Sequence, residues 1–75
     1  MKKFSKEQVE ELKRIYTNGI KIRLINMNDI QAVPSGTVGT VRCVDDIGTI
    51  HMEWESGSSL GLIYGVDKFE VVKTK

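Results

Sequence analysis

The side chains that could carry out acid–base or metal chemistry in this chain are few and lie close together in the sequence. His51 needs a carboxylate partner inside a cleft to act as a general base, and Glu53 falls on the same face of its predicted strand. An open sheet face does not exclude water, so we interpret His51 as a surface residue. Asp45 and Asp46 could offer oxygens to a cation. Two carboxylates in a tight turn are an incomplete ligand set, and aspartate favours turns.

The thiol and hydroxyl nucleophiles also lack catalytic partners. Ser58 and Ser59 have no histidine at a usable spacing. Cys43 is expected to point inward and to pack as a small core residue. The sequence contains no phosphate-binding loop and no dinucleotide fingerprint. We therefore predict that the protein is not an enzyme and uses no cofactor and no metal.

Size and composition place the chain in the class of small globular domains. Its 75 residues are 40% hydrophobic and 28% charged, which argues against disorder. One cysteine excludes an internal disulfide, and with one histidine it cannot complete a zinc site. We expect a reducing, cytoplasmic location, without secretion or membrane spanning. The net charge of +1 hides a basic segment, residues 1–23, followed by an acidic one, residues 24–72.

The N-terminal segment predicts an amphipathic helix over residues 4–17. Ser5 and Gln8 have the spacing of a capping box, and Glu10 and Arg14 that of an ion pair. Four apolar residues share one helical face: Val9, Leu12, Ile15 and Tyr16. Asn18 and Gly19 end the helix. The sequence leaves open whether this face docks on the rest of the chain or on a partner.

After Gly19 apolar residues recur at every second position instead of every third or fourth, which predicts short β-strands. A first strand spans residues 20–24, and a long loop, residues 26–35, follows it. Residues 36–54 form a hairpin around the four-residue turn 45–48. This register pairs Cys43 with Ile50, Val41 with Met52 and Gly39 with Trp54, so that glycine leaves room for the indole.

The remaining residues predict two short strands, near residues 60–62 and 69–72, separated by a helical turn at residues 65–68. The fold class is therefore mainly β with one N-terminal α-helix. We expect a small five-stranded, Src-homology-3-like (SH3-like) barrel capped by the helix. The expected organisation is an N-terminal helix over residues 1–18, a barrel over residues 19–72 and a basic tail over residues 73–75.

The barrel segments resemble a known family. The segments that carry the resemblance are Gly36-Thr-Val-Gly39-Thr-Val41, Val44-Asp-Asp-Ile-Gly48, His51-Met-Glu-Trp54-Glu-Ser-Gly57-Ser-Ser-Leu60 and Gly65-Val-Asp-Lys-Phe69-Glu-Val71. Over residues 19–72 the chain is similar to the domain-of-unknown-function family 4314. The resemblance implies a small barrel found in bacteria, their phages and mobile elements, with no established activity or site residues. It leaves the helix outside the family core.

The leading functional hypothesis is a non-enzymatic protein-interaction or adaptor module of unknown ligand. Small barrels bind peptides and nucleic acids through exposed aromatic side chains flanked by loops. The candidate contact residues are Met27, Asn28, Tyr64, Arg23 and Arg42. Trp54 is expected in the core, and Tyr64, beside a turn, on the surface.

Two alternatives remain open. The first is nucleic-acid binding through basic residues, helped by a similarity of Gly36-x-x-Gly39-x-Val41 to the start of a KOW motif. Its candidate cations are Lys2, Lys3, Lys13, Arg14, Lys21, Arg23 and Arg42. The second is self-association, in which a second copy completes a thin core and gives a weak homodimer; otherwise the chain is a monomer.

Overall fold

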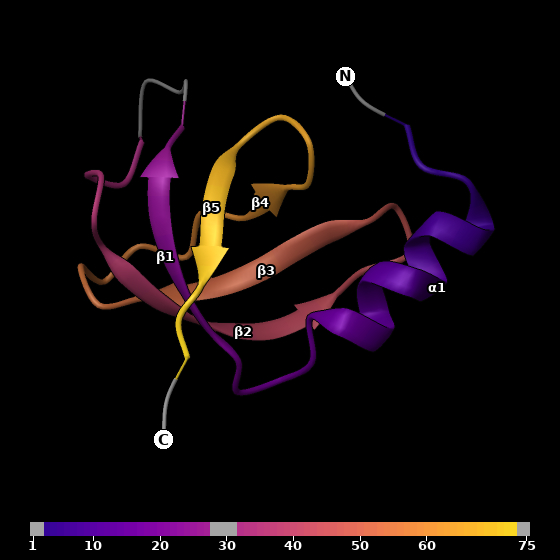
Figure 1. Ribbon diagram of the computed structural model, residues 1–75, viewed down its shortest axis with the longest axis horizontal. Coiled ribbons are helices and arrows are strands. Elements are labelled where there is room, and N and C mark those ends of the chain that lie inside the picture. The colour runs from indigo at the N-terminus through magenta and orange to yellow at the C-terminus, as the bar shows by residue number, and fades with distance from the viewer. Residues whose placement is uncertain (1–2, 28–31, 74–75) are drawn as a thin grey trace.

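The computed structural model describes residues 3–27 and 32–73, and these form one helix and five strands. Their bounds are α1 Lys6–Ile15, β1 Lys21–Asn26, β2 Val38–Val44, β3 Thr49–Trp54, β4 Leu62–Ile63 and β5 Lys68–Val71. All paired strands are antiparallel, in the order β4-β3-β2-β1-β5 (Figure 1). The mainly β class predicted from the sequence is confirmed.

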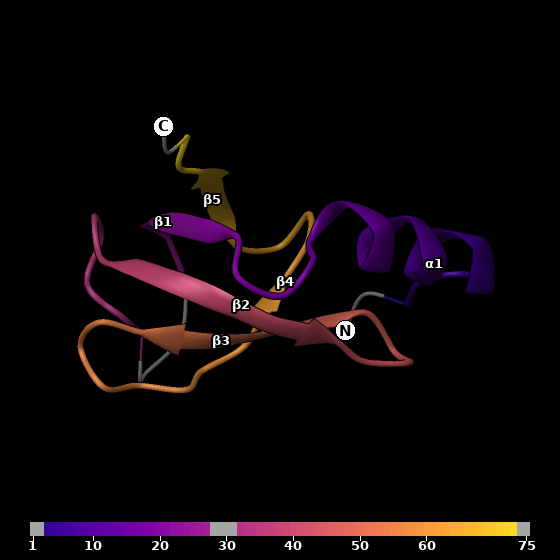
Figure 2. The ribbon, with the colours of Figure 1, turned by 90° about the horizontal axis from the view of Figure 1, so that it is seen from below.

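The sheet is strongly curved rather than flat. β1 pairs with β2 on one side and with β5 on the other, so the β1–β5 pair crosses over β2 and β3 (Figures 1 and 2). The edge strands of the sheet are β4 and β5. An isolated β-bridge joins Tyr64 to Asp67 between them, but in the described residues β4 and β5 are not hydrogen-bonded to each other as neighbouring strands. Closure of this sheet into a barrel therefore stays a prediction.

The helix begins as the sequence predicts. The Ser5 side chain accepts from the Gln8 N–H at 3.1 Å, and the Gln8 side chain accepts from the Ser5 N–H at 2.9 Å, which completes the capping box. The surface ion pair differs from the expected one, because Arg14 pairs with Glu11 instead of Glu10. The helix interior ends at Ile15, and Gly19 adopts a φ of 98° as the chain turns towards β1.

The apolar face of α1 docks on the protein's own sheet. Val9, Leu12 and Tyr16 are buried, and the last two belong to the central core cluster. Ile15, expected on the same face, is 43% exposed, so that prediction is wrong. The reason is geometric: at 3.6 residues per turn, Ile15 lies on the margin of the stripe rather than at its centre.

The hairpin confirms most of the predicted register. Gly39 pairs with Trp54 and Val41 with Met52, and the turn at residues 45–48 closes with Gly48 at a φ of 93°. A bulge then shifts the register between Val41 and Cys43. Cys43 lies opposite His51 rather than Ile50.

The bulge also reverses the expected orientation of Cys43. An extra residue in one strand exchanges inward and outward positions beyond it. Cys43 is exposed, and Val44, opposite Ile50, is buried in its place. The prediction of a core cysteine is therefore wrong. The larger apolar side chain of valine gains more from burial than a thiol does.

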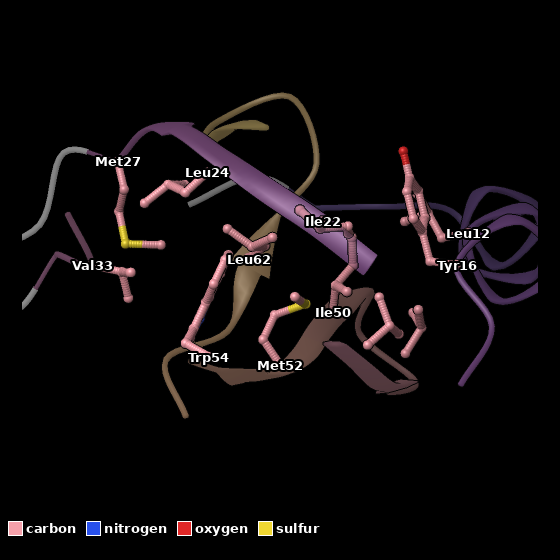
Figure 3. Close-up of a cluster of buried hydrophobic side chains, with 12 residues drawn as sticks. Leu12, Tyr16, Ile22, Leu24, Met27, Val33, Ile50, Met52, Trp54 and Leu62 are labelled. Carbon is pink, nitrogen blue, oxygen red and sulfur yellow. The ribbon is translucent and has the colours of Figure 1, made fainter. Parts of the chain in front are cut away.

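The core forms a continuous layer along the inside of the sheet (Figure 3). Trp54 is 3% exposed and its indole N–H donates to the Leu60 carbonyl at 2.7 Å, which confirms its core position. Met27 and Val33 lie at one end of the cluster, and Leu12 and Tyr16 at the other.

No helix formed by residues 3–27 and 32–73 has the length and apolar character needed to span a lipid bilayer.

Candidate functional site

Tyr64 is the aromatic residue that was predicted to lie on the surface. The structure places it there, with 48% of the residue exposed. It immediately follows β4 and belongs to a cluster of three aromatic rings. Its ring centroid lies 6.4 Å from that of Tyr16 and 6.4 Å from that of Phe69. Tyr16 and Phe69 meet edge to face at 5.7 Å. These contacts fix the orientation of an exposed ring, because edge-to-face aromatic pairs are favourable geometries.

A groove runs between Tyr64 and α1. Its lining residues are Phe4, Gln8, Glu11, Leu12, Ile15, Tyr16 and Tyr64, and we call it the Tyr64 groove. Its volume of about 210 Å³ is below the range of about 300–1,000 Å³ that is typical of small-molecule sites. The size favours one or two side chains of a partner segment over a whole cofactor. Ile15, which is 43% exposed, also lines this groove.

The two tyrosine hydroxyls at this groove have no hydrogen-bond partner among the described residues. Tyr16 as a whole is 8% exposed, yet no buried side-chain N or O atom of the described residues lacks a partner, so its hydroxyl reaches the surface. Burial, and then the neighbouring Tyr64, raise the pKa of Tyr16 above its ordinary value. The hydroxyl therefore stays protonated near neutral pH and remains a donor.

Met27 and Asn28 were predicted as contact residues in the long loop. Met27 is 8% exposed and packs in the core beside Val33, so its role as a surface contact is wrong (Figure 3). An unbranched thioether fills irregular core gaps well, and a thin core leaves few apolar residues free. Asn28 lies outside the described residues.

Arg23 and Arg42 are exposed, and each forms an ion pair with a neighbouring strand. Arg23 contacts Glu70 at 2.9 Å across the β1–β5 pair. Arg42 contacts Glu53 at 2.9 Å across the hairpin, the pair that the sequence predicts. Neither arginine lines the Tyr64 groove. The structure therefore does not bring the predicted contact residues together at one place.

His51 lies on the outer face of the hairpin, as predicted, but its partner is not Glu53. The imidazole Nε2 lies 2.8 Å from Asp45 Oδ2, and Asp45 Oδ1 accepts from the N–H groups of Ile47 and Thr49. Burial alone would raise the pKa of Asp45. The hydrogen bonds from His51, Thr49 and Ile47 outweigh burial and lower this pKa below its ordinary value. The main role of Asp45 is to hold the turn.

The metal-ligating side chains of this polar face are not clustered in the described part of the chain. Within the part of the chain that the structure describes, no group of three or more His, Cys, Asp or Glu side chains is placed to hold a metal ion. Cys43 lies opposite His51, and both side chains line an open depression of about 490 Å³ on this strand face.

Sequence reasoning missed most of the Tyr64 groove. Ile15 and Tyr16 were predicted together on the apolar face of the helix, and Phe4 was not predicted as a contact residue. The available signal was that Ile15 sits at the margin of the apolar stripe. Tyr16 and Tyr64 are far apart in the sequence, and only the docking of α1 on the sheet brings them together.

The fold and the groove define a small β domain with one docked helix and an aromatic surface groove. The family model for a domain of unknown function (DUF4314) matches residues 5–72, and the chain belongs to this family. The match begins at residue 5 and so includes the helix, which the resemblance over residues 19–72 had left outside. No curated protein and no solved structure matches the chain.

Proposed function

We propose that this protein is a non-enzymatic interaction module that binds a protein partner at the Tyr64 groove. One observation carries the proposal: in a domain with a thin core, two large apolar side chains, Tyr64 and Ile15, stay about half exposed and line the same groove. Apolar side chains gathered at a groove are typical of interaction surfaces.

The energetics of Tyr64 support a binding role. Tyrosine is enriched among the residues that dominate interface energies, because it gives a large contact area with few rotatable bonds. Contacts with Tyr16 and Phe69 already restrict the ring of Tyr64. A partner that covers it therefore has less side-chain entropy to remove than at an isolated surface tyrosine.

The alternative of nucleic-acid binding is weakened by the charge pairing of the basic residues. Four of the seven candidate cations contact a carboxylate, in the pairs Lys13–Asp46, Arg14–Glu11, Arg23–Glu70 and Arg42–Glu53. Lys21 donates to Thr40 instead. Lys2 lies outside the described residues, and Lys3 is exposed. Paired cations neutralise fewer phosphates, which favours a protein partner over a nucleic acid.

We further propose a cytoplasmic location in bacteria or their mobile elements. An exposed, unpaired thiol at Cys43 supports a reducing compartment, because exposed free cysteines oxidise readily elsewhere.

Co-purification from the native cell tests the proposed function. Tagged wild-type protein, the groove variant Tyr64→Ser and the control Ile25→Ser are compared. Ile25 is similarly exposed, at 46%, but lies on β1 and does not line the groove. We expect one partner protein to be retained by wild type and Ile25→Ser and lost with Tyr64→Ser. Equal retention by all three, or retention of nucleic acid that disappears at high salt, would contradict the proposal.

A further inference from the structure

We draw no further inference here: the strongest candidate, the open depression of about 490 Å³ on the β2–β3 hairpin where Cys43 lies opposite His51, rests on a lone cysteine, and no second observation in the described part of the chain points to a ligand there.

Discussion

Adding one methyl group at Gly39 is expected to destabilise the protein through its contact with Trp54. A Cβ at this position would lie 2.6 Å from Trp54 Cε3, 2.9 Å from Trp54 Cδ2 and 3.0 Å from the terminal methyl of Met52. Carbon atoms in contact are normally about 3.5–4.0 Å apart. The indole would therefore have to move away, but its N–H is bound to the Leu60 carbonyl at 2.7 Å.

The magnitude follows from these contacts. Overpacking costs about 1–3 kcal/mol, and loss of the indole hydrogen bond about 1 kcal/mol. Replacing glycine by alanine within a strand returns about 0.5–1 kcal/mol of chain entropy. We expect Gly39→Ala to lose about 1–3 kcal/mol of the free energy of unfolding. That is a large share of the total of about 4–11 kcal/mol that is usual for a domain of this length.

Urea unfolding followed by circular dichroism measures this loss, and a double-mutant cycle assigns it. In a Trp54→Leu background the clash disappears, so Gly39→Ala should cost much less than in the wild type. Gly57→Ala is the control variant. Gly57 has a φ of 94°, and no atom lies within 4 Å of a Cβ added there, so this substitution introduces backbone strain without a steric clash. Its loss of stability should therefore be the same with Trp54 and with Leu at position 54. Unchanged stability of Gly39→Ala, or an equal loss in both backgrounds, would refute the argument.

Three further predictions follow from the polar face of the hairpin. The exposed thiol of Cys43 should react stoichiometrically with a thiol-specific disulfide reagent in the native state. A thiol that reacts only after unfolding would contradict the bulge that turns Cys43 outward. Asp45→Asn should lower stability by about 1 kcal/mol or less, because the site is partly exposed. Because hydrogen bonds lower the pKa of Asp45, its contribution to the free energy of unfolding is present above the ordinary pKa of about 3.9 and is lost as the pH falls through the folded-state pKa. The difference in stability between Asp45→Asn and the wild type, measured by urea unfolding, should therefore vanish in acid. A difference that stays constant with pH would contradict this assignment. Glu53→Gln, which breaks an exposed ion pair with Arg42, should change the free energy of unfolding by less than about 1 kcal/mol. A loss above about 2 kcal/mol in the same urea unfolding experiment would contradict the small contribution expected of this ion pair.

The sequence predicted the elements whose signals are local. The capping box at Ser5, the glycine turn at Gly48 and the fit of Gly39 against Trp54 depend on neighbouring residues or on one pairing register. The error at Cys43 has a different origin. Period-two alternation assumes an unbroken strand, and nothing in the residues 41–44 marks the bulge that exchanges Cys43 and Val44.

The candidate site was predicted only at Tyr64. The groove exists because α1 docks on the sheet, where it contacts β2, and this brings Ile15 and Tyr16 next to a residue far along the chain. Such long-range placement is not encoded in any local pattern. Met27 was misassigned for a related reason. A methionine at the start of a loop gives no local sign that it turns inward to pack with Val33.

Site-specific photo-crosslinking in the native cell tests the central claim, that the Tyr64 groove contacts a protein partner, most directly. A benzophenone amino acid replaces Tyr64 in one variant and Ile25 in another. Both positions are about half exposed, and the second does not line the groove. The claim predicts a discrete protein adduct on irradiation of the position-64 variant and none from position 25. No adduct at position 64, or the same adducts from both positions, would contradict it.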